Sequence, residues 1–312
     1  MNILIVGLGS IAKKHINALQ LLKIDAKLFA LRSTQNAIKT SGIENIYTVD
    51  EFSILFDFVI ISNPTHLHYP YIKKFAELGV PLFIEKPFVH TLDKINELLR
   101  LIQKKNIVTY VACNLRFHPC ITFLKSKLDL KLLKINEVNI YCGSYLPGWR
   151  PGKDYKTIYS ANADMGGGVH LDLFHELDYA TWLFGLPAKS HSVLRNVSSL
   201  NINAIDYANY ILEYESFTTS IILNYFRKKA KREIEIVFED KTWTIDLINH
   251  SIKDDNESVL FEAKGFDIQE TYNLQLDYFI NCLKQSKLPM NNINESADTL
   301  NILLKNGEKI KK

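Results

Sequence analysis

The chain has 312 residues, 47% of them hydrophobic, and its 37 basic and 34 acidic residues leave a formal net charge of +3. We expect it to divide into two domains, because single hydrophobic cores stop growing at about 250–300 residues. The near balance of charge excludes a global electrostatic field that would attract nucleic acid or an anionic membrane surface.

The four cysteines, Cys113, Cys120, Cys142 and Cys282, form no CxxC pair and show no spacing typical of metal ligands. We therefore expect reduced, buried thiols in a reducing compartment. No basic region precedes the short apolar run at the start, and no stretch approaches the roughly 20 apolar residues of a membrane span. These features predict a cytoplasmic protein that binds neither nucleic acid nor membrane.

The first element is an apolar strand, Met1–Val6, followed at once by the glycine pattern of residues 7–12. Gly7 allows a tight turn, Gly9 lets the backbone approach a pyrophosphate, and Ala12 allows close packing of the next helix. A bare turn is the alternative, but the position between a strand and a helix favours dinucleotide binding.

The helix expected from Ser10 to Leu22 directs its N-terminal amide groups and the positive end of its dipole at the phosphates. The predicted phosphate contacts are Gly7, Gly9, Ser10 and Ile11.

A second parallel strand is expected at Ala26–Leu31, and the ribose of the cofactor is normally recognised just after it. A carboxylate there would accept the ribose hydroxyls of NAD, but the residues present are Arg32 and Ser33. An arginine with small hydroxyls suits a 2′-phosphate, so we predict NADP rather than NAD. The alternative is that Arg32 stacks on the adenine or is solvated.

Two more buried strands, Phe56–Ser62 and Pro81–Ile84, end in polar segments, Asn63–His68 and Glu85–Pro87. Ligands in open α/β sheets bind beyond the carboxyl ends of strands, so these segments should share one edge with the glycine loop. The predicted cofactor contacts here are Asn63, Pro64, His68, Glu85 and Lys86. Helices are expected from the Asn63–His68 segment to Leu78 and over Leu92–Lys104, and a strand over Ile107–Ala112, which completes a Rossmann domain of residues 1–118.

The second half changes character, because several of its strands alternate apolar and polar side chains. We expect an α+β domain of residues 119–312 with an open, mainly antiparallel sheet whose free face forms a homo-oligomer, a dimer or tetramer. The expected strands are 137–142, 208–214, 218–224, 232–238 and 241–246, and the expected helices are 168–183, 267–285 and 295–306.

Four motifs together resemble the glucose-fructose oxidoreductase / inositol dehydrogenase / MocA (Gfo/Idh/MocA) family, in order and over essentially the whole chain. They are the 7–12 glycine loop with His15, Asn63-Pro64 with His68, Glu85-Lys86-Pro87, and Gly166-Gly167-Gly168 with Asp172, His175 and Asp178. The resemblance implies an NAD(P)-dependent oxidoreductase acting on CH–OH groups of a sugar, sugar derivative or cyclitol.

The resemblance also implies catalytic roles: Lys86 beside the nicotinamide, His175 as acid/base, and Asp172 as their orienting neighbour. The commoner family pattern has four positions between aspartate and histidine, whereas these two are three apart. Residues i and i+3 share a helix face, so both are expected to point at one site.

Alcohol oxidation needs a base near neutral pKa beside the reacting hydroxyl, and histidine meets this requirement. Acidic Asp172 and Asp178 on nearby helix faces favour His175 for that role, while His170 is expected to be structural. A cation at Lys86 can stabilise alkoxide in the transition state. The alternative for Lys86 is a solvated loop lysine in a weak ion pair with Glu85.

A long loop, residues 144–156, is rich in aromatic and basic side chains. Such loops are often functional, and this composition suits an anionic sugar, either nucleotide-linked or a sugar acid such as a nonulosonate. A subunit-interface arm is an equal alternative. The predicted substrate contacts are Tyr145, Trp149, Arg150, Lys153, Tyr155 and, at the end of the first domain, Arg116. Arg116 and neighbouring His118 have hinge packing as their alternative.

His66 and His68 have no third ligand at a recognisable spacing, so no metal is expected. Two other functions remain open: a non-catalytic dinucleotide sensor of the same fold, and a reductase of an imine or tetrapyrrole. Lys86 and His175 argue against a sensor, which needs neither.

Overall fold

The computed structural model describes residues 1–36, 39–48, 55–305 and 307–309. They form two compact units, the first from Met1–Asn114 with Asp267–Ala297, and the second from Leu115–Phe266 with the described residues from Asp298 onward. The expected single division after residue 118 differs from this arrangement. The division differs because helix α7 (Gln269–Lys284), from late in the chain, packs against α1 (Ser10–Leu21) in the first unit.

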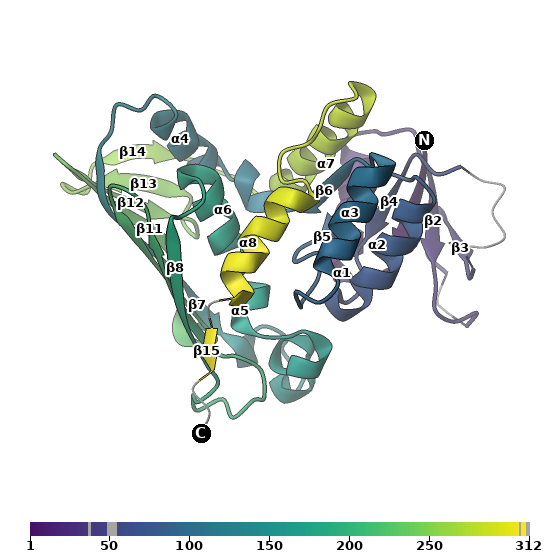
Figure 1. The fold of residues 1–312 in the computed structure, drawn as a ribbon, viewed down its shortest axis with the longest axis horizontal. Coiled ribbons are helices and arrows are strands. Elements are labelled where there is room, and N and C mark those ends of the chain that lie inside the picture. The colour runs from purple at the N-terminus through teal and green to yellow at the C-terminus, as the bar shows by residue number, and fades with distance from the viewer. Residues whose placement is uncertain (37–38, 49–54, 306, 310–312) are drawn as a thin grey trace. The chain divides into compact units, whose positions relative to one another are not determined.

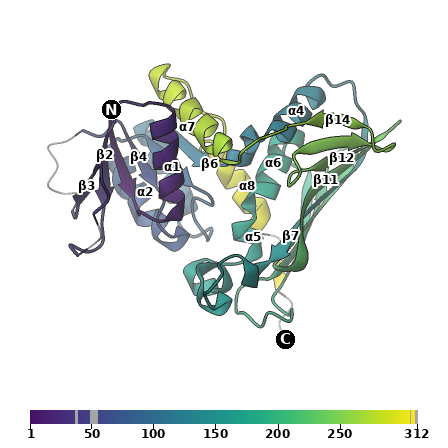
Figure 2. The same ribbon diagram turned by 180° about the vertical axis from the view of Figure 1, so that it is seen from behind.

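The first unit is built on a six-stranded parallel sheet in the order β3-β2-β1-β4-β5-β6. Its strands are β1 (Asn2–Val6), β2 (Lys27–Leu31), β3 (Ile43–Ile46), β4 (Phe58–Ile61), β5 (Leu82–Glu85) and β6 (Thr109–Ala112). Helices α2 (His68–Glu77) and α3 (Ile95–Lys105) cover one face (Figure 1), and α1 covers the other (Figure 2). Every residue of β4, β5 and β6 is buried, as expected for strands that are covered on both faces. The predicted Rossmann fold is confirmed; β3 was not expected.

The strands of this sheet end level with one another. Val6 pairs with both Leu31 and Ile61, and Ile61 pairs with Ile84. The segments after β1, β2, β4 and β5 therefore emerge along one side of the sheet, which we call the carboxyl edge. The strand order reverses between β1 and β4, and ligands of open α/β sheets bind at such a switch point.

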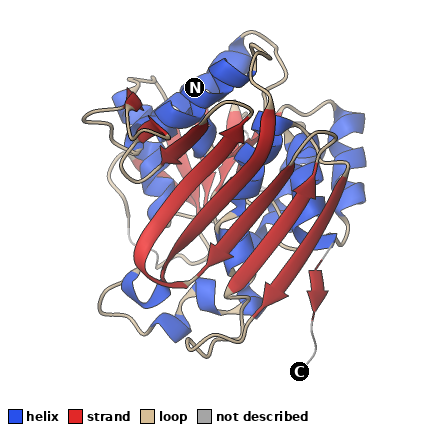
Figure 3. Cartoon of the chain, turned by 90° about the vertical axis from the view of Figure 1, so that its left-hand side faces the viewer, coloured by secondary structure: helices blue, strands red, loops and turns tan. Residues whose placement is uncertain are grey.

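The second unit is built on a nine-stranded sheet in the order β14-β13-β12-β11-β7-β10-β9-β8-β15, and Figure 3 looks onto its broad face. Its pairings are antiparallel except those of β7 with β10 and of β8 with β15, which confirms a mainly antiparallel sheet. The strands are β7 (Ile135–Tyr145), β8 (Lys189–Arg195), β9 (Tyr207–Glu213), β10 (Thr218–Asn224), β11 (Phe226–Phe238), β12 (Thr242–Asp246), β13 (Ser251–Asp254), β14 (Val259–Glu262) and β15 (Gly307–Lys309).

Helices α4 (Pro119–Leu128), α5 (Val169–Asp172), α6 (Phe174–Phe184) and α8 (Ile293–Lys305) complete the fold. α5 packs on β9 and β10, and α4 packs on α6 and β14. The single helix expected over residues 168–183 is two helices, interrupted at Leu173. α4, β8, β13, β14 and β15 were not expected, and Asn306, the expected end of the last helix, lies outside the described residues. No helix within the described ranges is long and apolar enough to cross a membrane.

Candidate active site

The glycine loop after β1 leaves room for a phosphate above its backbone. A Cβ on Gly9 would meet nothing within 4 Å, and Gly9 caps α1 without a side-chain hydrogen bond. The first turn of α1 also contains no acidic residue. The amide groups at this helix end are therefore available to an anion, so the loop fits the pyrophosphate that the sequence predicted.

Gly7 has a different role. Its φ is +86°, and a Cβ there would lie 2.6 Å from Cα of Asn63. Glycine is thus required at position 7 for two reasons: the turn after β1, and the close approach of the segment that follows β4. This approach brings Asn63 and Pro64 to the first loop.

The buried ring of His68 holds this second segment in place. His68 is 1% exposed, and its Nε2 donates to the Asn63 carbonyl oxygen at 2.8 Å. Burial lowers the pKa of His68. The ring therefore supports the Asn63 turn, and the predicted contact of His68 with the cofactor stays a prediction.

Arg32 lies on the carboxyl edge, directly after β2. Its main-chain N–H donates to the Ile46 carbonyl oxygen at 2.8 Å, and its side chain is half-buried beside exposed Ser33. Because Leu31 pairs with Val6, Arg32 is level with Gly7. Arg32 and Ser33 therefore lie on the same edge of the sheet as the glycine loop.

Glu85 is the last residue of β5, and Lys86 follows it on the same edge. The Glu85 Oε1 lies 2.6 Å from Nε2 of the buried His15 on α1, so the carboxylate is held from within the unit. Lys86 is half-buried and is joined to Pro87 by a cis peptide bond.

In the second unit, the triple glycine brings two segments of backbone together. A Cβ on Gly167 would collide with the carbonyl oxygens of Tyr159 and Asn162, and Gly168 has a φ of +132°. The triple glycine therefore allows this segment to pack closely against main chain of the same unit. This packing fixes the start of α5.

Asp172 ends α5, and His175 is the second residue of α6, with the interruption at Leu173 between them. Asp172 and His175 therefore do not share a face of one helix, contrary to the prediction. Asp172 is instead fixed by Tyr225, whose hydroxyl donates to its Oδ2 at 2.5 Å. Burial, followed by the charge of Asp172, raises the pKa of Tyr225, which keeps the phenol protonated as the donor.

The acidic neighbours of His175 on α6 are paired with arginines. Arg116 donates from Nε and Nη2 to the two carboxylate oxygens of Asp178 at 2.9 and 2.8 Å, and the side chains are 3% and 1% exposed. Arg232 on β11 donates from Nε to Oε1 of buried Glu176 at 2.6 Å. Arg116 and Asp178 thus form a buried ion pair within the second unit, and the predicted substrate contact of Arg116 stays a prediction.

The aromatic and basic loop is connected to Asp172 through Tyr225. Trp149 packs edge-on against Tyr225 with ring centroids 5.3 Å apart, and its indole N–H donates to Ser144 at 2.8 Å. Lys228 lies 3.3 Å from the ring centroid of Tyr145. The exposed basic side chains of the loop are Arg150, Lys153 and Lys156. The hydroxyl of Tyr155 donates to the Leu200 carbonyl oxygen, so Tyr155 anchors the loop.

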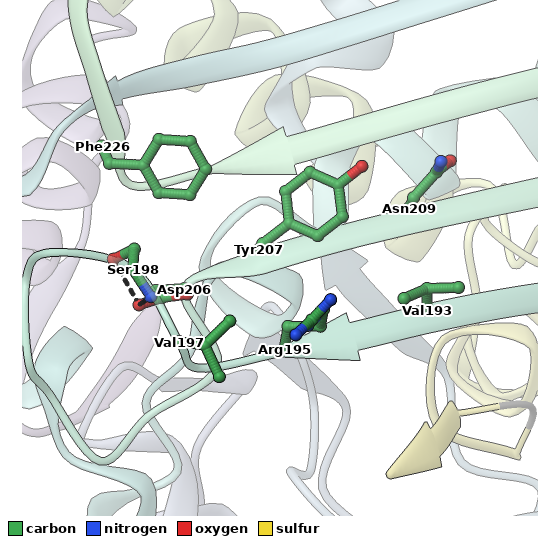
Figure 4. A pocket seen from close by; sticks show the side chains of 8 residues that line it. All are labelled: Val193, Arg195, Val197, Ser198, Asp206, Tyr207, Asn209 and Phe226. Carbon is green, nitrogen blue, oxygen red and sulfur yellow. Dashed lines mark hydrogen bonds between the residues drawn. The ribbon is translucent and has the colours of Figure 1, made fainter. Parts of the chain in front are cut away.

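The second unit also has a cavity of about 530 Å³ at the β8–β9 end of its sheet (Figure 4). Its lining residues are Val193, Arg195, Val197, Ser198, Asp206, Tyr207, Asn209 and Phe226. None is a predicted site residue. In the part of the chain that the structure describes, no three histidine, cysteine, aspartate or glutamate side chains are grouped as a metal site.

Sequence reasoning missed Tyr225, Glu176 and Arg232. Tyr225 is 53 residues from its partner Asp172 in the sequence, and Glu176 is 56 residues from its partner Arg232. The available signals were a tyrosine directly after an apolar strand and charged residues in otherwise apolar segments, which are common in strands and helices of ordinary cores.

Two family models match the chain. An oxidoreductase-family model with an NAD-binding Rossmann fold matches residues 1–113, and a GFO/IDH/MocA C-terminal domain model matches residues 134–244. The scyllo-inositol 2-dehydrogenase (NAD(+)) of Bacillus subtilis is 24% identical over 92% of this chain and 87% of its own length.

Two solved structures show the same fold. The WlbA dehydrogenase of Bordetella pertussis, in complex with NADH and UDP-GlcNAcA, has a TM-score of 0.82 and 18% identity, covering 98% of this chain and 94% of that one. The myo-inositol 2-dehydrogenase of Lactobacillus plantarum has a TM-score of 0.78 and 18% identity, covering 97% and 95%. With both domain models matched in order, the chain belongs to the GFO/IDH/MocA family of oxidoreductases.

Proposed function

We propose that this oxidoreductase transfers a hydride between a nicotinamide cofactor, NAD or NADP, and the hydroxyl or carbonyl carbon of a sugar or sugar derivative. The observation that supports this most is the carboxyl edge of the first unit. There an open backbone above Gly9 and an uncapped helix end lie on the same edge as Glu85 and Lys86. One edge of one sheet thus carries both a backbone suited to phosphates and a lysine that could stabilise negative charge on the reacting oxygen.

When bound, the nicotinamide supplies the hydride acceptor or donor. We assign to Lys86 the stabilisation of negative charge on the substrate oxygen. We assign to His175 the removal of the hydroxyl proton, and its return in the reverse direction. Asp172, held by Tyr225, is assigned to orient these groups.

We further propose that Arg32 and Ser33 recognise the 2′-phosphate of NADP. Titration of NADPH and NADH into the purified protein, followed by fluorescence, with mass spectrometry of any co-purifying cofactor, tests this. Tight NADPH and weak NADH binding is the expected result, and Arg32→Ser should remove the difference. Preference for NADH would overturn the assignment of Arg32, and binding of neither would overturn the proposed activity.

The substrate that we propose is an anionic sugar, either nucleotide-linked or a sugar acid. Trp149 offers an aromatic surface next to Tyr225 and Asp172, and Arg150 and Lys153 add exposed positive charge in the same loop. Reduction of NAD(P) with UDP-GlcNAcA as probe should exceed that with uncharged myo-inositol. The opposite order would overturn the anionic class and retain the dehydrogenase.

We also propose that the chain is cytoplasmic and forms a homo-oligomer through the free face of its nine-stranded sheet. Along β9, buried residues alternate with more exposed ones such as Ile211, which is 42% exposed. Light scattering should give a dimer or tetramer, and a charge at Ile211 (Ile211→Glu) should shift it towards the monomer.

A further inference from the structure

We propose that His15 is a positioning residue that joins the phosphate-binding end of α1 to Glu85 and Lys86, and so sets the affinity for the nicotinamide half of the cofactor. The inference rests on the proposed cofactor function. It concerns a residue that faces the interior and that we do not place in contact with the cofactor.

His15 connects two elements of the carboxyl edge through one short hydrogen bond. It is the sixth residue of α1, is 0% exposed, and its Nε2 lies 2.6 Å from Oε1 of Glu85 at the end of β5. An ionised carboxylate only accepts hydrogen bonds, so the imidazole donates through Nε2. The helix that offers amide groups to phosphates thereby holds the residue that precedes Lys86.

Packing fixes the orientation of the imidazole. The ring meets Phe83 edge-on at 5.0 Å and Tyr272 of α7 at 5.9 Å between centroids. α7 is itself tied to α1, because Gln269 donates to the Lys14 carbonyl oxygen at 3.1 Å and the Lys14 ammonium lies 4.6 Å from the Tyr272 ring centroid. His15 therefore has little freedom to release Glu85.

The two halves of the site depend on different contacts. The phosphate end is shaped by main chain, through Gly9 and the approach of Gly7 to Asn63. The Glu85 side chain, by contrast, is only 12% exposed and is held by His15, and Lys86 is its neighbour. Loss of the donor at position 15 should thus affect the nicotinamide end and spare the phosphate end.

The test compares His15→Gln with His15→Asn. The Gln amide reaches about as far as Nε2, whereas Asn offers the same amide one methylene short of Glu85. The probes are NADH or NADPH, whichever the wild type binds more tightly, and the matching fragment without nicotinamide, ADP-ribose or 2′-phospho-ADP-ribose. Dissociation constants from fluorescence and calorimetry are measured alongside melting temperatures.

We expect His15→Asn to weaken binding of the reduced cofactor at least about tenfold while the fragment stays within about twofold, and His15→Gln to resemble wild type for both. Equal weakening of cofactor and fragment would show that His15 only packs, and unchanged binding of both would also overturn the inference. If His15→Asn does not fold, His15→Phe keeps the ring without the donor and is judged by the same criteria. Failure of the wild type to bind either probe would instead refute the proposed cofactor, and this inference with it.

Discussion

The two units place their candidate residues by different means. In the first, Gly9, Arg32 and Asn63 follow the ends of neighbouring parallel strands and Glu85 is the last residue of another, so the topology alone brings them to one edge. In the second, the surroundings of His175 depend on side-chain partners that are remote in sequence. A motif in the sequence is thus sufficient to place residues at one edge where strand topology does so, and insufficient where side-chain partners decide their surroundings.

The largest effect is expected from removing the side chain that we assign as the base. His175→Ala should lower turnover by about 10²–10⁴-fold, the usual contribution of a positioned acid/base. Cofactor affinity should be nearly unchanged, because the phosphate cradle belongs to the first unit. Steady-state kinetics with a fluorescence titration measure both, and a rate like wild type would refute the assignment.

The next largest effect is expected from breaking the buried ion pair between Arg116 and Asp178, which lies on α6 like His175. Arg116→Leu leaves Asp178 charged, buried and unpaired, which should reduce the free energy of unfolding by about 3–5 kcal/mol. Arg116→Leu with Asp178→Leu should recover most of this loss, since no uncompensated charge remains. Urea denaturation of the single and double variants gives the comparison; additive losses would contradict the pairing.

Tyr225 tests whether a hydrogen bond to Asp172 matters for the reaction. Tyr225→Phe removes the donor with little change of shape, so the free energy of unfolding should fall by about 1–3 kcal/mol. Turnover should fall about tenfold with KM for the probe sugar little changed, because an unheld Asp172 no longer orients the site. Tyr210→Phe, which removes another buried tyrosine hydroxyl that donates to the Leu303 carbonyl oxygen, is the matched control and should leave turnover unchanged. Equal turnover of Tyr225→Phe and wild type would remove Asp172 from the account.

Gly7 gives the smallest effect and sharpens the role of main chain in the first unit. A Cβ at its φ of +86° would press against Asn63, so Gly7→Ala should lower the free energy of unfolding by roughly 1–3 kcal/mol. Thermal melting followed by circular dichroism measures this. An unchanged melting temperature would mean that the segment after β4 can shift to accommodate the Cβ, which would contradict the requirement for glycine.

The sequence was sufficient for five of the six strands of the Rossmann sheet and for its carboxyl edge, because apolar strands, the glycine loop and the polar strand ends are local patterns. It was insufficient where distant contacts decide. The interruption at Leu173 separates Asp172 from His175 within a stretch that the sequence predicted as one helix. The return of α7 to α1 follows from packing that no motif records. Arg116 could not be assigned until its carboxylate partner, 62 residues away, was known.

The central claim is that the backbone above Gly9 holds the cofactor phosphates, and Gly9→Ala tests it most directly. Gly9 has a φ of −83°, which alanine adopts, and its Cβ would meet nothing within 4 Å, so the fold should be unaffected. We predict an unchanged melting temperature together with loss of NADH and NADPH binding in a fluorescence titration. Wild-type affinity in the folded Gly9→Ala variant would contradict the account.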